Sequence, residues 1–207
     1  MTPSLGSAPV AFLTAGQGTD GPEFTHAWQA VLARGGQPVL VSQAPRGIDL
    51  RSRFDRAETA PVDVQVQGAS AASFAGLVLP GGMVHSEVLR VHPPAVGFVR
   101  DFFSAGLPVA AMGRASRLLI EADVIRHRRL TSWPGMRADL SNAGAIWVAD
   151  HVVTCDDGPN TLITCRERSD LPAFCDIFTR KFSGSAGSTR PASPARHALI
   201  AAARARR

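Results

Sequence analysis

The chain has 207 residues, of which 45% are hydrophobic, and a formal net charge of +5. This length and composition allow one sizeable core, and no stretch approaches the roughly 18 consecutive apolar residues that a membrane span requires. The first residues lack a basic start followed by an apolar run, so we expect a cytoplasmic protein without a membrane partner.

Short apolar runs alternate with helical patterns over the first part of the chain. Continuous runs at residues 10–15, 38–41, 76–80 and 108–112 are typical of strands covered on both faces. Apolar residues at helical spacing predict helices over residues 23–34, 94–104 and 115–122. This alternation predicts an α/β fold with a doubly wound, mostly parallel sheet sandwiched by helices.

The other segments are less regular. Residues 43–68 are polar, and the alternating stretch at 62–67 predicts a peripheral edge strand or hairpin. Beyond residue 122 the patterns predict strands at 129–133, 145–149, 152–155 and 161–165, a turn at 134–135, a short helix ending at 142, a hairpin turn at 156–160 and an amphipathic helix at 171–182.

The positive charge lies at the C-terminal end. All 17 acidic residues and all but five of the 22 basic residues precede residue 184, so residues 1–183 carry no net charge. We expect one domain over residues 1–183 and a flexible basic tail over residues 184–207, whose start is rich in glycine, serine and proline. A basic tail can contact nucleic acid through nonspecific charge, but it is more often a solvated extension, so we expect no nucleic-acid partner.

The cysteines and histidines indicate neither disulfides nor a metal site. Cys155, Cys165 and Cys175 are odd in number and match no paired spacing, so we interpret them as core thiols. We expect them to lie in late strands or the last helix, away from the turn at residue 113. The six histidines show no paired metal-binding spacing, and we expect neither a metal nor a cofactor.

A turn at residue 113 connects a buried strand to a helix. In α/β hydrolytic enzymes such a turn holds the nucleophile. Here it contains Gly113 and Arg114, and neither side chain can attack a carbonyl. Ser116 lies one residue later than the serine of a GxSxG elbow, so we interpret its hydroxyl as helix-stabilising.

Ligands of open α/β sheets bind at the carboxyl ends of the strands. We expect the loops at residues 16–23, 81–87 and 113–117 to converge there on one pocket. In the first loop, Asp20 and Glu23 suit a helix cap and a first-turn charge, or one of them points into the pocket and tunes an acid–base partner.

The third loop offers an anion-binding hole. Backbone N–H groups at the helix start, with a donor from Gly81 or Gly82, would hold a carboxylate or phosphate beside Arg114 and Arg117. Alternatively these arginines face solvent or pair with acidic side chains, for which the candidates are Asp20, Glu23 and Glu87.

The first loop also matches the GxGxxG pattern of dinucleotide-binding proteins at Gly16, Gly18 and Gly21. That pattern requires an acidic residue at the end of the second strand, whereas here the first acidic residue after it is Asp49. We therefore do not expect nucleotide binding.

The chain resembles the PfpI family of intracellular proteases and amidases over about residues 8–183. This family belongs to the class I glutamine amidotransferase-like superfamily, which also holds the human parkinsonism-associated deglycase. The resemblance is carried by VAFLT at 10–14, LVLPGG at 77–82, LLIEA at 118–122, LTSWP at 130–134, NAG at 142–144, LITC at 162–165 and DLPAFC at 170–175.

The resemblance implies roles for particular residues. Family members carry Ala-Ile-Cys-His-Gly at the elbow, so Gly113 and Arg114 stand in place of the cysteine nucleophile and the adjacent histidine. The family's pocket glutamate maps to Glu23, and an acidic position earlier in the loop maps to Asp20. Glu87 maps to an acid that in the protease branch reaches a neighbouring subunit. Self-association, as a homodimer or a higher homo-oligomer, is implied as well.

These inferences lead to two hypotheses. Loss of a nucleophile typically costs about a million-fold in turnover, so we expect a pseudoenzyme. It would act as a stress-related homo-oligomer or bind a small anionic or carbonyl ligand at Gly81, Gly82, Gly113, Arg114 and Arg117. The alternative is a cysteine-independent hydrolase, lyase or isomerase that uses Glu23 or Asp20 as base and Arg114 as an electrostatic clamp.

Overall fold

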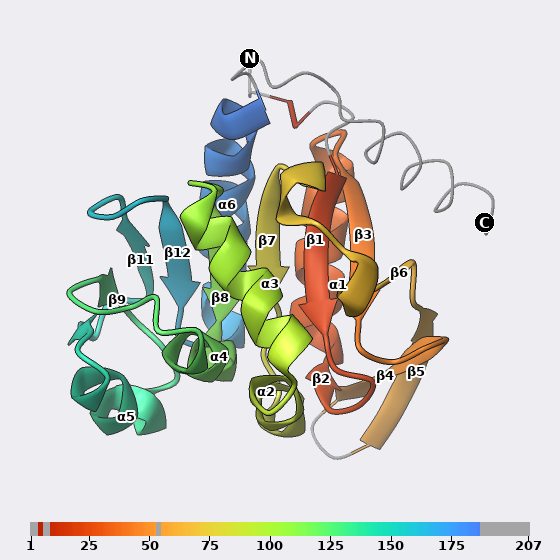
Figure 1. The fold of residues 1–207 in the computed structure, drawn as a ribbon, viewed down its shortest axis with the longest axis horizontal. Coiled ribbons are helices and arrows are strands. Elements are labelled where there is room, and N and C mark those ends of the chain that lie inside the picture. Colours follow the sequence, from red (N-terminus) through yellow and green to blue (C-terminus); the bar gives the residue numbers. More distant parts are fainter. Residues whose placement is uncertain (1–3, 6–8, 53–54, 187–207) are drawn as a thin grey trace.

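The computed structural model describes residues 4–5, 9–52 and 55–186. Their main feature is a sheet of seven strands in the order β11-β12-β8-β7-β1-β3-β6 (Figure 1). Its strands are β1 (Pro9–Thr14), β3 (Gln37–Ser42), β6 (Val64–Gln65), β7 (Gly76–Leu79), β8 (Val109–Met112), β11 (Val152–Cys155) and β12 (Leu162–Cys165). Every pair is parallel except β11 with β12. The predicted fold class is confirmed.

Helices cover both faces of this sheet. They are α1 (Gly21–Ala33), α2 (Met83–Arg90), α3 (Pro93–Ser104), α4 (Ser116–Glu121), α5 (Arg137–Asn142) and α6 (Leu171–Ala186). In Figure 1, α3 crosses in front of the sheet while α1 and α6 lie behind it. None of the helices in the described residues is long and apolar enough to cross a membrane.

Two hydrophobic cores lie on opposite faces of the sheet. Along β1, Ala11 and Leu13 pack into the core that includes α3 and α4, whereas Val10 and Phe12 pack into the core that includes α1 and α6. Successive strand side chains point to opposite faces, so a strand covered on both faces needs an unbroken apolar run. This explains why the strand positions were readable from the sequence.

Two small sheets lie beside the central one. β9 (Arg129–Leu130) pairs in parallel with β10 (Ile146–Trp147), so the strands predicted at 129–133 and 145–149 are shorter than expected. In the polar region, β4 (Gly47–Ser52) and β5 (Asp55–Pro61) form an antiparallel hairpin, and β2 (Thr19–Asp20) pairs with β4. The expected edge strand is β6, which is confined to residues 64 and 65.

α2 was not predicted, since residues 81–87 were expected to form a loop. The buried positions of this helix are His85, Ser86 and Leu89, two of them polar, whereas Met83 and Val84 are exposed. At eight residues, this helix is too short for apolar spacing alone to distinguish it from a loop. At the other end of the domain, α6 includes residues 184–186 of the expected tail, and residues 187–207 lie outside the described part of the chain.

Candidate functional site

The elbow lies where β8 ends and the chain turns into α4. Gly113 has φ +50°, a left-handed conformation that glycine adopts at little cost. Residues 113–115 form a single 3₁₀ turn before α4 begins at Ser116. The buried Ser116 hydroxyl donates to the Gly113 carbonyl oxygen at 2.9 Å. Ser116 therefore stabilises the turn, as expected, and does not act as a free nucleophile.

Glu23 lies in the first turn of α1 and points toward the elbow. Its side chain is buried, and its Oε2 accepts a hydrogen bond from the Gly81 backbone N–H at 2.8 Å. A Cβ atom placed on Gly113 would stand 3.9 Å from Glu23 Oε1. The loops that carry Glu23, Gly81 and Gly113 therefore converge at one edge of the sheet, as predicted.

The environment of Glu23 changes its acidity. Burial raises the pKa of its carboxyl from 4.5 to about 7, and the negative charge of Asp20 adds to the increase. The Gly81 N–H and the Arg168 guanidinium oppose this shift. A carboxyl with this pKa is present in both protonation states near neutral pH, which suits a general acid or base.

Asp20 caps the start of α1, which was one of the two roles predicted for it. Its side chain accepts a hydrogen bond from the Glu23 backbone N–H at 3.0 Å and thereby caps α1. It also pairs with Arg168, whose Nε lies 3.2 Å from Asp20 Oδ1. This partner was not predicted, because Arg168 comes from the turn before α6 and lies far from Asp20 along the chain.

The two elbow arginines have different surroundings. Arg117 pairs with Glu87, and its Nη2 lies 3.4 Å from Asp139 Oδ2. Of the two roles predicted for it, Arg117 therefore pairs with acidic side chains. The Arg114 guanidinium lies over the Trp133 ring, 5.2 Å from its centroid. Among the residues described, Arg114 forms no ion pair, and it remains the cation at the elbow that can meet a ligand.

The glycines of the second loop are already engaged. The Gly81 N–H, predicted as a donor to a ligand, donates to Glu23 instead. Gly82 has φ +136°, and a Cβ on it would overlap the backbone oxygen of Gly18. The loops of α1 and α2 therefore approach so closely that only glycine fits at this position.

Replacing Gly82 with alanine is expected to lower the free energy of unfolding by about 2 kcal/mol, because the new methyl group adds overlap to an unfavourable φ. Gly97→Ala is the matched control. Gly97 lies inside α3 with open space around its Cβ position, so alanine there should stabilise the protein by about 0.5–1 kcal/mol. Urea unfolding measures both, and equal effects would contradict the close approach.

The three cysteines are buried and free, as expected. One expectation about them was wrong, because Cys165 is not remote from the elbow: β12 pairs with β8 and places Cys165 beside Met112. Burial, together with the charge of Glu23, raises the pKa of the Cys165 thiol well above its usual range. Burial also raises the pKa of Cys175 to about 12. Neither thiol is an activated thiolate.

A cavity of about 630 Å³ lies next to this edge. It is lined by Gln17, Gly18, Thr19, Asp20, Arg51, Gly82, Met83 and Val84. Its walls thus include the N-cap of α1 and the glycine that follows Gly81. Across the described residues, no three histidine, cysteine or acidic side chains are grouped to hold a metal ion.

The parallel sheet, the left-handed turn between β8 and α4 and the facing acid together have the architecture in which α/β hydrolytic enzymes hold a nucleophile elbow. The chain belongs to the DJ-1/PfpI family, because the sequence model of that family matches residues 8–181. A crystal structure of Drosophila melanogaster DJ-1beta shares the fold with a TM-score of 0.73 and 22% identity, covering 96% of this chain and 97% of that one.

Curated relatives carry related names. Protein/nucleic acid deglycase 2 of Escherichia coli is 37% identical over 142 residues, which are 68% of this chain and 79% of that protein. General stress protein 18 of Bacillus subtilis is 32% identical over 67% of this chain and 78% of the relative. An uncharacterized Archaeoglobus fulgidus protein is 42% identical over 113 residues, and the chain spans 64% of its length.

Proposed function

We propose that this protein is a nucleophile-free member of its family that binds a small ligand at the elbow without cysteine-dependent chemistry. Gly113 carries the proposal, since it stands where the resemblance places the family's cysteine. Two supporting facts are the high pKa of Cys165, the thiol beside the elbow, and the engagement of Ser116 with the Gly113 carbonyl. Neither Cys165 nor Ser116 is therefore an obvious replacement nucleophile.

The ligand we propose is small and contains a carbonyl or an anionic group. A protonated Glu23 would donate a hydrogen bond to a carbonyl oxygen, and the Arg114 guanidinium would face a negative charge. The cavity of about 630 Å³ lined by Asp20 and Gly82 is within the size range of small-molecule sites, and it lies beside the elbow, since neither Glu23 nor Arg114 is among its lining residues. We also propose that the protein is a cytoplasmic homo-oligomer. A stress-related role is part of the proposal because the Bacillus subtilis relative is named General stress protein 18.

The pKa of Glu23 favours a second candidate function. A carboxyl with a pKa of about 7 is suited to accept a proton from a substrate, and Arg114 would stabilise the resulting negative charge. This would be a cysteine-independent hydrolase, lyase or isomerase. Asp20 is the less available carboxylate of the two, because it caps α1 and pairs with Arg168.

Methylglyoxal is a small carbonyl compound of the kind proposed as the ligand. Its consumption by the full-length chain tests the proposal. We expect no turnover above the buffer rate, and none in Cys165→Ala. Turnover that survives Cys165→Ala but disappears in Glu23→Gln would overturn the proposal in favour of the second candidate. Turnover that disappears in Cys165→Ala would show that a relocated thiol performs the chemistry. Circular dichroism spectra of both variants establish that they are folded.

A further inference from the structure

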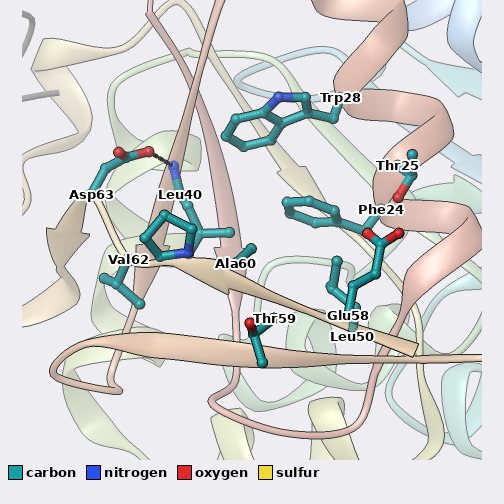
Figure 2. Close-up of a pocket in the computed structure, with 11 residues that line it drawn as sticks. Phe24, Thr25, Trp28, Leu40, Leu50, Glu58, Thr59, Ala60, Val62 and Asp63 are labelled. Atoms are coloured by element: carbon teal, nitrogen blue, oxygen red, sulfur yellow. Dashed lines mark hydrogen bonds between the residues drawn. The ribbon is translucent and has the colours of Figure 1, made fainter. Parts of the chain in front are cut away.

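Two further cavities lie away from the elbow. One, of about 350 Å³, lies between α1 and the β4–β5 hairpin, where the rings of Phe24 and Trp28 are stacked (Figure 2). The other, of about 650 Å³, lies toward the opposite end of the central sheet, between α3, residues 122–128 and the hairpin turn that joins β11 to β12. We call it the α3 cavity. It shares no lining residue with the cavity beside the elbow, and its volume is within the range of small-molecule sites.

A buried arginine lines the α3 cavity. Arg128 is only 3% exposed. Its guanidinium donates hydrogen bonds to Cys155 Sγ at 3.2 Å, the Cys155 carbonyl oxygen at 2.9 Å, Asn160 Oδ1 at 3.1 Å and the Asn160 carbonyl oxygen at 2.8 Å. None of these acceptors is a carboxylate, and Arg128 forms no ion pair with any residue that the structure describes. Because arginine stays protonated in proteins, Arg128 places a positive charge at the cavity without a directly bonded counter-ion, and burying such a charge is costly unless an anion balances it.

The other charged side chains of the lining leave it positive. They are Arg100, Arg126, Asp123 and Asp157, so with Arg128 the cavity has three arginines against two aspartates. Arg126 Nη2 lies 3.7 Å from Asp123 Oδ1, and the charges of this pair balance each other. Arg100 donates through its Nε to a backbone carbonyl oxygen at 3.1 Å, whereas among the described residues nothing accepts a hydrogen bond from its Nη1 or Nη2. The two Nη groups of Arg100 are therefore available to a ligand.

The position of Arg128 is fixed by its neighbours. Its guanidinium lies 5.9 Å from the centroid of the Phe103 ring. A Cβ on Gly158 would overlap Arg128 Nη1, so the hairpin turn lies directly against the guanidinium. The Asp156 carboxylate of the same turn is engaged elsewhere, since its Oδ2 pairs with Lys181 Nζ at 2.8 Å. The positive charge is therefore held at the cavity before any ligand arrives, which lowers the cost of binding.

We propose that the α3 cavity binds a small oxyanion, such as a phosphate group. Arg100 would donate to the oxygens of this anion, and the buried charge of Arg128 would add an attraction that water screens little. A cation would be repelled by the same arginines, and a neutral molecule would gain little from either charge. Asp157 opposes the binding of an anion, so its removal should raise the affinity. The site is separate from the elbow, and the proposal does not depend on the proposed function.

Titration of the full-length protein with inorganic phosphate tests this site. Backbone amides are followed by NMR at constant pH, with sodium chloride adjusted so that the ionic strength does not change. We expect the amides of Asp123 and Gly158 to shift saturably with phosphate and with sulfate, and not with tetramethylammonium. Shifts that grow without saturation would indicate an adventitious ion only and would overturn the proposal, as would an equal response to tetramethylammonium.

Two variants change the charge of the lining in opposite directions. Arg100→Gln removes a donor and a positive charge and should weaken phosphate binding at least about fivefold. Asp157→Asn removes the opposing negative charge and should strengthen phosphate binding about threefold. Both positions are exposed, and Arg180, an exposed arginine on α6 outside the cavity, gives the control Arg180→Gln, which should bind phosphate like the native protein. Unchanged affinity in Arg100→Gln, or weaker binding in Asp157→Asn, would contradict the site.

Discussion

Replacing Glu23 with glutamine is expected to raise the free energy of unfolding by about 2–3 kcal/mol at pH 8 and to change it little below pH 4.5. The folded protein holds the pKa of this carboxyl at about 7, against an ordinary value of 4.5. Between pH 4.5 and pH 7 the folded state binds more protons than the unfolded state. The stabilising contribution of the protonated carboxyl is therefore lost as the pH rises through this range. Glutamine remains neutral at every pH and can still accept the Gly81 hydrogen bond through its amide oxygen.

His85 is expected to change the free energy of unfolding with pH in the opposite direction to Glu23. It is buried in α2, its Nδ1 accepts a hydrogen bond from the Ala15 backbone N–H at 3.0 Å, and burial lowers its pKa from 6.5 to about 4. Between pH 4 and pH 6.5 the unfolded state binds more protons, so this contribution to stability increases as the pH rises. The contributions of Glu23 and His85 therefore largely cancel between pH 4.5 and pH 6.5.

Single substitutions should separate these two contributions. In Glu23→Gln, stability should rise with pH by about 3 kcal/mol between pH 4 and pH 6.5, because His85 acts alone. In His85→Asn, where the amide oxygen replaces Nδ1 as acceptor, stability should fall as the pH rises from 4.5 to 7. Urea unfolding at pH 4, 4.5, 6.5, 7 and 8 measures these slopes. Glu121→Gln, at a partly exposed ion pair with Arg90, is the control and should change stability by less than about 0.5 kcal/mol.

The sequence predicted the central strands and α1 well because each feature is local. Buried parallel strands require continuous apolar runs, and Asp20 followed by Pro22 marks the start of a helix. The glycine at position 113, where the resemblance places the family's cysteine, was equally visible. Each of these statements depends on neighbouring residues alone.

The features that sequence reasoning missed depend on strand order and on distant partners. Cys165 lies beside Met112 only because β12 inserts between β11 and β8 in the sheet. Arg168 reaches Asp20 from the opposite end of the chain. α2 was not predicted because its eight residues are too few for apolar spacing to distinguish a helix from a loop.

The double variant Gly113→Cys, Arg114→His is expected to consume methylglyoxal at least about 1,000-fold faster than the native protein, because removing a nucleophile typically costs more than this. The new Cβ would stand 3.9 Å from Glu23 Oε1, which places the thiol within reach of the carboxyl. A protonated Glu23 can donate a hydrogen bond to a thiolate and so lower the pKa of the thiol. Steady-state assays at pH 7 with matched protein concentrations measure the gain.

Two controls separate chemistry from strain at the elbow. A Cβ on Gly113 approaches the Arg166 carbonyl oxygen to 3.2 Å and meets an unfavourable φ of +50°, so any side chain there costs stability. Gly113→Ala carries the same strain without a thiol and should stay inert. Adding Glu23→Gln to the double variant keeps the thiol but removes the ionisable acid, and it should lower the gained rate at least tenfold. If the folded double variant has a titratable, reactive thiol and yet consumes no methylglyoxal, the site has diverged beyond the loss of its nucleophile.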